Sequence, residues 1–163
     1  MSNGTLRNMA TVYIRDKDKM LLLDRIGSKV VQRSWCGIGG HFKGKELNNA
    51  RACVLRELKE ETGLKEKDVS NLKLRYIALR LVEEELRINY YFFADLNPGA
   101  ALTKHCPEGN LEWVGLNELH NRKMPYTAQR VIGHYMEIGI NTNDFYCAAV
   151  DNDHFSIHSL GVS

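Results

Sequence analysis

The sequence lacks the features that mark several large classes of protein. It has no run of about 18 apolar residues, so no transmembrane helix is predicted. The first residues, MSNGTLRN, have no apolar segment behind their charges, so no secretory signal is predicted either. The formal net charge is only +2, too small an excess to indicate a surface for nucleic acid. We therefore expect a protein that is neither exported nor inserted in a membrane, and whose partner is not a nucleic-acid polymer.

Cysteine pairs are also missing. No two of the four cysteines, Cys36, Cys53, Cys106 and Cys147, have the C-x-x-C spacing. Cys53 and Cys147 fall within apolar runs, where buried free thiols are common. These observations favour reduced thiols in a cytoplasmic protein.

Internal repeats, low-complexity tracts and linkers are absent as well. A chain of 163 residues without them suits one domain over residues 1–163. Within that domain we expect residues 1–8 to be flexible.

The chain mixes strand and helix patterns. MATVYIRD and KMLLLDR predict a hairpin around residues 16–18, and LKLRYIALRLVEEELRINYYFFADL predicts a second hairpin with its turn at residues 83–85. LEWVGL predicts one more strand, and DFYCAAVDNDHFSIHSL predicts two with a turn at residues 151–153. One helix is predicted from an Asn49 N-cap to Gly63, and a second, TAQRVIGHYMEIG, up to Gly139. The sequence thus predicts an α/β fold, with a mixed sheet flanked by helices.

The first predicted helix carries three acidic residues on one face. At about 100° per residue, Glu57, Glu60 and Glu61 lie on an arc beside the apolar stripe that contains Val54 and Leu58. Glu57 and Glu61 are a repulsive i, i+4 pair, and the negative end of the helix dipole disfavours the last two acids. A solvated surface is the ordinary explanation for such a face. The position beside the apolar stripe and the Gly-Gly turn before the helix favour the alternative, a site for Mg²⁺ or Mn²⁺.

The stretch GGHFKGKE raises a different possibility, a P-loop. Gly39, Gly44 and Lys45 match the Walker A spacing, but Glu46 stands where that motif has a hydroxyl. A P-loop also needs a helix directly after the lysine, whereas residues 48–49 delay it. We interpret the likeness as accidental.

The run GGHFKGKELNNARACVLRELKEETGL resembles the Nudix box. Residues 56–64 fit the second half of that motif at every position, and Gly40 to Glu46 has the spacing of its first half. Nine residues separate Glu46 from Arg56, where the family has seven. We interpret the difference as a two-residue insertion before the helix, with Glu46 still reaching the site.

The resemblance implies a Nudix-type α/β/α sandwich that hydrolyses a nucleoside diphosphate linked to another group. By that resemblance, Glu60 and Glu61 bind a divalent metal ion, Mg²⁺ or Mn²⁺, and Glu57 binds metal or positions the attacking water. Arg56 would orient the glutamates, and a backbone carbonyl of the Gly39–Gly40 pair would add a metal contact.

Outside the box, SWCGIGGHF and PEGNLEWVGLNEL resemble MutT-like enzymes that clear oxidised purine nucleotides. That likeness makes Glu108 the candidate for a further metal contact, with Glu112 as second choice. Four residues are candidates for contact with the substrate: His41 with a phosphate, Trp35 by stacking on a base, and Tyr126 and Gln129 with the purine. Burial in the sheet is the alternative for Trp35, and a place in the core is the alternative for Tyr126.

The resemblance predicts hydrolysis of a nucleoside triphosphate, including oxidised purine forms such as 8-oxo-dGTP, to a monophosphate and pyrophosphate. ADP-ribose or another nucleotide sugar is the alternative substrate. A Nudix module that senses a nucleotide without cleaving it is the contrasting function, but Glu57, Glu60 and Glu61 are all present. A monomer and a homodimer both fit these expectations.

Overall fold

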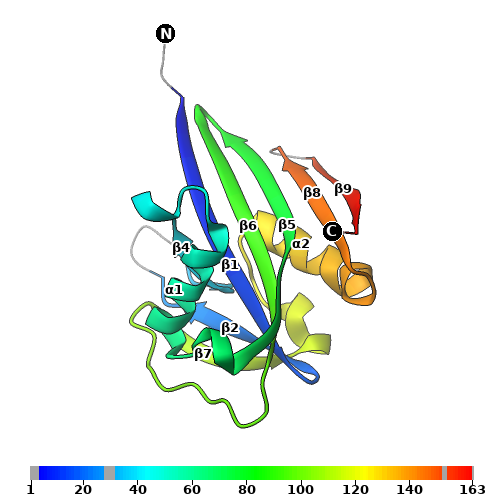
Figure 1. The fold of residues 1–163 in the computed structure, drawn as a ribbon. Coiled ribbons are helices and arrows are strands. Elements are labelled where there is room, and N and C mark those ends of the chain that lie inside the picture. The colour runs from blue at the N-terminus through cyan, green and yellow to red at the C-terminus, as the bar shows by residue number, and fades with distance from the viewer. Residues whose placement is uncertain (1–3, 28–31, 152–153, 163) are drawn as a thin grey trace.

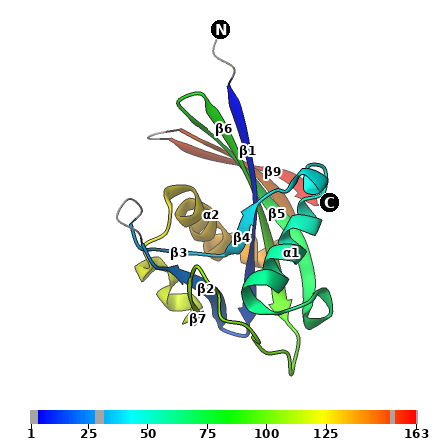
Figure 2. The ribbon, with the colours of Figure 1, turned by 90° about the vertical axis from the view of Figure 1, so that its left-hand side faces the viewer.

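A mixed β-sheet carries helices on both of its faces (Figures 1 and 2). The computed structural model describes residues 4–27, 32–151 and 154–162. The strands in this part of the chain are β1 (Thr5–Asp16), β2 (Lys19–Arg25), β3 (Ser34–Cys36), β4 (Ile38–His41), β5 (Val69–Val82), β6 (Glu85–Leu96), β7 (Gly109–Gly115), β8 (Asp144–Val150) and β9 (Phe155–Val162). The helices are α1 (Ala50–Thr62) and α2 (Tyr126–Glu137), with 3₁₀ turns η1 (Gly44–Glu46), η2 (Glu66–Asp68), η3 (Leu116–Asn121) and η4 (Gly139–Asn141).

The strand order is β3-β2-β1-β6-β5-β8-β9, with β4 paired to β1 and β7 paired to β2. The two predicted hairpins are confirmed, because β1–β2 and β5–β6 are antiparallel neighbours. The β1–β6 and β5–β8 pairs are parallel, so the sheet is mixed, as predicted. Strand β1 begins at Thr5, which pairs with Glu85. Residues 5–8 thus belong to a strand and residues 1–3 lie outside the described residues, and the expected flexibility of residues 1–8 stays a prediction.

The core consists of two apolar layers, one on each face of the sheet. Successive side chains of a strand point to opposite faces, and β1 shows the consequence. Tyr13 packs into the layer under α2 with Val131, whereas Val12 packs into the layer under α1 with Val54. Each helix therefore covers one face, and α1 lies beside β4 and β1.

The predicted ends of α1 are confirmed. The Asn49 side chain accepts a hydrogen bond from the backbone N–H of Ala52 at 3.0 Å, as an N-cap does. Gly63 closes the helix in the left-handed conformation, with φ of 78°, and its N–H donates to Lys59 O at 3.1 Å. The two caps therefore fix where α1 begins and ends, and with that which residues lie on the face toward β4.

The predicted end of the second helix is wrong by two residues. Helix α2 ends at Glu137, and Gly139 begins η4 instead of capping the helix. A Cβ at Gly139 would lie 2.2 Å from the Tyr76 hydroxyl, so this glycine permits a close approach. Tertiary packing therefore explains Gly139 better than helix capping does.

Helix α1 begins at Ala50 instead of directly after Lys45, which excludes a P-loop. All four cysteines are free. In the described part of the chain, neither helix is long and apolar enough to cross a membrane. Of the turn predicted between the last two strands, residues 152 and 153 lie outside the described residues.

Candidate active site

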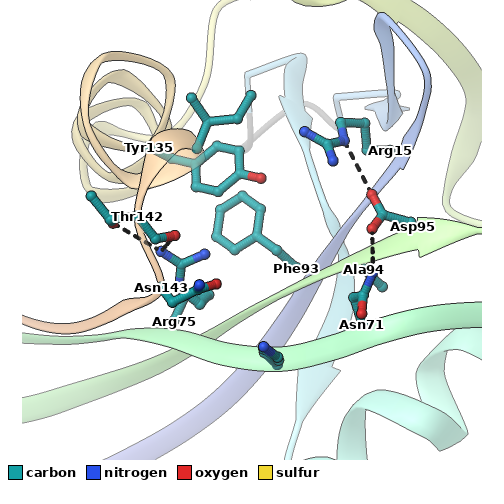
Figure 3. A pocket seen from close by; sticks show the side chains of 11 residues that line it. Arg15, Asn71, Arg75, Phe93, Ala94, Asp95, Tyr135, Thr142 and Asn143 are labelled. Carbon is teal, nitrogen blue, oxygen red and sulfur yellow. Dashed lines mark hydrogen bonds and ion pairs between the residues drawn. The ribbon is translucent and has the colours of Figure 1, made fainter. Parts of the chain in front are cut away.

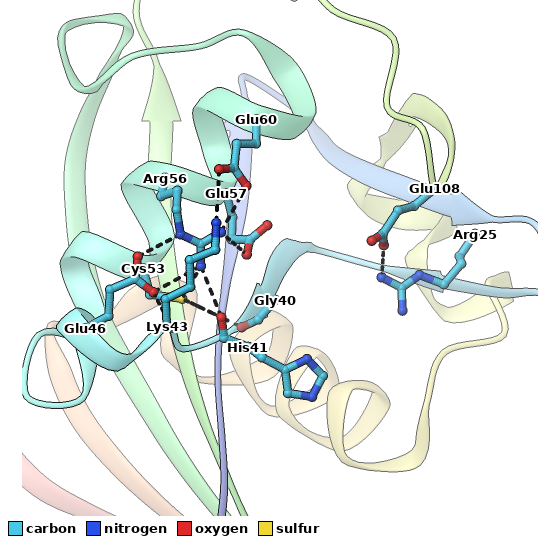
Figure 4. A network of polar contacts seen from close by, with 10 residues as sticks. All are labelled: Arg25, Gly40, His41, Lys43, Glu46, Cys53, Arg56, Glu57, Glu60 and Glu108. Atoms are coloured by element: carbon cyan, nitrogen blue, oxygen red, sulfur yellow. Dashed lines mark hydrogen bonds and ion pairs between the residues drawn. The ribbon is translucent and has the colours of Figure 1, made fainter.

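The acidic face of α1 meets the Gly39–Gly40 segment of β4 (Figure 4). Strand β4 pairs with β1 so that Gly39 lies opposite Thr11 and Gly40 opposite Ala10. A Cβ at Gly39 would lie 2.1 Å from the carbonyl oxygen of Ala10, so the strand can approach β1 this closely only with glycine.

Glu61 is the most deeply buried of the three acids, with 5% of the residue exposed. Its Oε2 is buried and has no hydrogen-bond partner among the described residues. Burial, the largest cause, raises the pKa of Glu61 together with the charges of Glu57 and Glu108, while Arg25 and the backbone N–H of Gly39 oppose the rise; the resulting pKa is about 8. An unpartnered buried carboxylate oxygen is costly, and a bound cation would remove that cost.

Glu57 lies directly against Gly40. A Cβ added to Gly40 would stand 2.5 Å from Oε1 of Glu57. The missing side chain therefore makes space for this carboxylate next to the backbone. Glu57 and Glu61 are the pair that the helical spacing predicts, and the structure brings both to the Gly39–Gly40 segment.

Arg56 joins the acidic residues of the loop and the helix into one network (Figure 4). Its Nη1 donates to Glu57 Oε1 at 2.5 Å and to Glu60 Oε2 at 3.0 Å. Its Nε and Nη2 donate to the two carboxylate oxygens of Glu46, at 2.7 and 3.0 Å. Nη2 also donates to the backbone oxygen of His41 at 3.1 Å. The guanidinium thus fixes the orientation of Glu57 relative to the β4 loop.

Glu46 reaches this network despite the longer spacing to Arg56. Glu46 is the last residue of η1, and its Oε2 also accepts a hydrogen bond from the backbone N–H of Lys43 at 2.8 Å. The bonds from Arg56 lower the pKa of Glu46 to about 2. Glu46 therefore holds the arginine, and its carboxylate oxygens are both already engaged.

Glu46→Gln should destabilise the folded protein to an extent that depends on pH. The folded-state pKa is lowered from 4.5 to about 2, so the stabilisation is present above pH 4.5 and disappears as the pH falls toward 2. We expect the substitution to lower the free energy of unfolding at pH 7 by at most roughly 3 kcal/mol and by much less at pH 2 to 3. Urea titrations at several pH values would measure this. Equal losses at all pH values would contradict the assignment.

Glu60 differs from the other two acids. Its side chain is 51% exposed, and besides Arg56 it has Lys43 Nζ at 3.5 Å from Oε1. The structure therefore places Glu60 at the rim of the acidic face. Lys43, which the sequence did not single out, provides a second cation beside Arg56.

Glu108 enters from the loop before β7. It forms an ion pair with Arg25, and its charge acts on Glu61. Arg25 is the last residue of β2, which pairs with β7, so the register of these strands brings Arg25 opposite Gly109. Nothing in the local spacing of the sequence marked Arg25. Glu112 lies further along β7, with its Oε1 3.6 Å from Arg122.

The residues around Gly39 and Gly40 fit a hard divalent cation. The donors are carboxylate and backbone carbonyl oxygens, which Mg²⁺ and Mn²⁺ prefer, and Glu61 supplies the unpartnered oxygen. No three Asp, Glu, His or Cys side chains in the described ranges are already gathered as a metal site. Glu57 and Glu60 both accept from Nη1 of Arg56.

The space beside Gly40 gives a second prediction. In Gly40→Ala the new methyl group would overlap the end of the flexible Glu57 side chain, and the backbone would not have to move. If Glu57 has the role that the resemblance implies, turnover should fall by about tenfold or more, because a misplaced catalytic group costs up to about 100-fold. The melting temperature should change little. Gly39→Ala is the contrast, since its Cβ would meet the backbone of Ala10, and it should destabilise the fold.

The four substrate candidates lie in different surroundings. His41 is exposed, and its Nε2 accepts from Arg7 Nε at 2.6 Å. Burial and the charge of Arg7 lower the pKa of His41, so the neutral ring is favoured. Trp35 is half-buried, with the Arg122 guanidinium 4.9 Å from its ring centroid. A base could stack on that side of the ring only if Arg122 moved or joined the stack.

Tyr126 and Gln129 lie on the first turn of α2. Tyr126 is half-buried instead of a core residue, and the Arg80 guanidinium lies 5.9 Å from its ring centroid. Gln129 is exposed and lines a surface hollow that Tyr126 also lines. Their proposed contact with the base stays a prediction.

Comparison with known proteins identifies the fold. The family model for the NUDIX domain matches residues 5–135. The structure is similar to the MutT protein of Bacillus halodurans, with 21% identity, a TM-score of 0.67 and coverage of 93% of this chain and 97% of that chain. It is also similar to the NUDIX domain of Shewanella oneidensis NrtR in complex with ADP ribose, with 15% identity, a TM-score of 0.62 and coverage of 84% and 89%.

A third similar structure is an Ap4A hydrolase of C. elegans in a binary complex, with 15% identity, a TM-score of 0.64 and coverage of 85% and 99%. At these identities the three structures show a shared fold. The family match ends at residue 135, and the assignment of residues 1–163 to one domain stays a prediction.

Proposed function

The chain belongs to the NUDIX domain family and is a pyrophosphohydrolase of nucleoside diphosphate derivatives, and from this premise we propose that its substrate is a nucleoside triphosphate. Oxidised purine forms such as 8-oxo-dGTP are included in this proposal. The products are the nucleoside monophosphate and pyrophosphate.

One observation carries the assignment of the site: the buried, unpartnered Oε2 of Glu61 beside Gly39 and Glu57. Without a ligand, the carboxylates of Glu57 and Glu61 lie close together in a poorly solvated position, and the repulsion between their negative charges is unfavourable. A functional site can tolerate such an arrangement when the ligand supplies the missing positive charge.

The proposed roles follow from what each residue contacts. Glu57 and Glu61 hold a divalent cation, Mg²⁺ or Mn²⁺, together with a backbone oxygen of the Gly39–Gly40 segment, and Glu60 and Glu108 are further ligands from the rim. When bound, the cation neutralises charge on the diphosphate and lowers the pKa of a bound water.

The chain itself provides orientation and charge. Arg56 keeps the Glu57 carboxylate in position, and Glu46 holds Arg56 in turn. Arg25, Lys43 and Arg7 stand around the carboxylates and can attract the polyphosphate. Attack of water on a phosphorus atom then needs mainly positioning and charge neutralisation, which these residues supply.

The test is a panel of nucleoside triphosphates, oxidised purine triphosphates, ADP-ribose and nucleotide sugars, incubated with Mg²⁺ or with Mn²⁺ and with a chelator. Products are identified by chromatography and by an assay for pyrophosphate. We expect monophosphate and pyrophosphate from a triphosphate, and no turnover with the chelator.

The other outcomes identify the alternatives. AMP with ribose 5-phosphate as the main products would replace the triphosphate proposal by an ADP-ribose pyrophosphatase. Tight nucleotide binding without any cleavage at saturating metal would contradict the catalytic assignment and indicate a sensing module.

A further inference from the structure

A cavity lies on the face of the sheet that α2 covers, at the end of β1 that carries Arg15 (Figure 3). Its volume is about 250 Å³, and it is bounded by the ends of β1, β5 and β6 and by the segment that joins α2 to β8. Among the ionised side chains that line it, positive charges outnumber negative ones. Arg15, Lys73 and Arg75 are cationic, and Asp95 is the one carboxylate among the lining residues. Its lining therefore favours an anion.

Arg75 is a buried guanidinium, with 8% of the residue exposed. Its Nε donates to Asp144 O at 2.9 Å, and Nη2 donates to Gly139 O and Thr142 O, both at 2.9 Å. These acceptors are neutral carbonyls. Within the described ranges no carboxylate forms an ion pair with Arg75, and no hydrogen bond engages its Nη1. A buried charge without a counter-ion is unfavourable, and an anion in the cavity would compensate it.

Asp95 is already engaged on both of its oxygens. Oδ1 accepts from Arg15 Nε at 3.1 Å, and Oδ2 accepts from Asn71 Nδ2 at 2.9 Å, as Figure 3 shows. Asp95 therefore compensates Arg15 and leaves the charges of Arg75 and Lys73 unbalanced.

Several side chains that line the cavity have hydrogen-bond donors without an acceptor in the described part of the chain. In the described part of the chain, the two Nη atoms of Arg15, the Nζ of Lys73 and the hydroxyl of Tyr135 have no hydrogen-bond partner. Figure 3 shows the Tyr135 hydroxyl pointing toward the side of the cavity where Arg15 lies. A ligand with several acceptor oxygens is needed to use these donors together, and a phosphoryl group offers three or more.

We propose that this cavity binds a small phosphoryl anion, orthophosphate or pyrophosphate, through Arg75, Lys73 and Arg15. The volume is below the roughly 300 to 1,000 Å³ of sites for drug-sized ligands, so a small anion fits better than a whole nucleotide. The inference does not use the carboxylates of α1. It holds or fails independently of the function proposed above.

The experiment is a titration of the full chain with orthophosphate and with pyrophosphate, in a chelating buffer so that no divalent cation links the anion to the catalytic carboxylates. Backbone amide shifts in ¹⁵N NMR spectra report the place of binding. Saturable shifts at Asp95, Thr142 and Asn143 are expected, with acetate binding more weakly. Shifts confined to Gly39, Gly40 and Glu61, or shifts that do not saturate, would overturn the proposal.

Three variants distinguish binding of the anion in this cavity from general attraction of the anion to a basic surface. Lys73→Ala should weaken binding about fivefold or more, as expected for the loss of one hydrogen bond to a charged group. Asp95→Asn should tighten binding, because it removes the one carboxylate of the cavity. Lys104→Ala, at an exposed lysine that does not line this cavity, is the control and should leave the affinity unchanged.

Equal weakening by Lys73→Ala and Lys104→Ala, or weaker binding in Asp95→Asn with a native spectrum, would refute the site. Arg75 is left intact in these tests. Its bonds to three backbone carbonyls hold the segment before β8, so a change there would also alter the fold.

Discussion

Glu61→Gln is expected to lower turnover by about a hundredfold or more, the size of effect seen when one group that stabilises transition-state charge is removed. Glutamine keeps the shape of the side chain but loses the negative charge that the proposed cation needs. The fold should survive, because burial already disfavours the ionised form of Glu61, whose pKa is raised to about 8. Steady-state kinetics at saturating Mg²⁺ would measure the effect.

The fold is checked separately in a chelating buffer. A carboxyl group with a raised pKa binds its proton more tightly in the folded state, so its contribution to stability declines as the pH rises from 4.5 to about 8. The wild-type protein should show this decline, and Glu61→Gln should not. Retained turnover at saturating metal would refute the role of Glu61.

Glu46→Gln should lower turnover less than Glu61→Gln does, since Glu46 acts through Arg56. An equal loss of turnover in the two variants would indicate that the loop has the usual family register.

Arg56→Gln is expected to be the most damaging change for the stability of the site. It removes the partner that Glu46 and Glu57 share while leaving both carboxylates buried. Breaking one side of a buried ion pair costs roughly 3 to 5 kcal/mol. Turnover should fall as well, because Glu57 loses its orientation beside Gly40. Urea denaturation and kinetics on the same preparation would test both expectations.

Arg51→Gln is the matched control for this prediction. Arg51 lies on the same helix, but its ion pair with Glu66 is exposed, and exposed pairs contribute between about 0 and 1 kcal/mol. A loss of stability in Arg56→Gln no larger than in Arg51→Gln would contradict the network. Wild-type turnover in Arg56→Gln would contradict the positioning role of Arg56.

The local parts of the fold and of the site could be predicted from the sequence. Helix α1 has strong end signals, Asn49 and Gly63, and both are confirmed at the predicted positions. The hairpins were recognisable because β-type apolar runs flank short polar turns at residues 16–18 and 83–85. The common face of Glu57 and Glu61 follows from helical spacing alone, since both residues belong to one rigid element.

What depends on distant residues could not be predicted in the same way. The ion pair between Arg25 and Glu108 results from the register of β2 against β7, and residues 26–107 separate the two in sequence. The role of Glu46 was obscured by the two extra residues before α1. The cavity around Arg75 is built by segments from both halves of the chain, and no single motif in the sequence indicates it.

The parallel pairing in the sheet has a consequence for how activity appears during refolding. Strand β1 pairs with β6, whose residues stand 80 positions further along, and β5 pairs with β8 at a separation of 70. Closing such long loops slows folding, whereas α1 can form from neighbouring residues. After dilution from denaturant, the circular-dichroism signal of the helices should therefore recover before the enzymatic activity does. The lag between the two signals measures the time the chain needs to order its sheet.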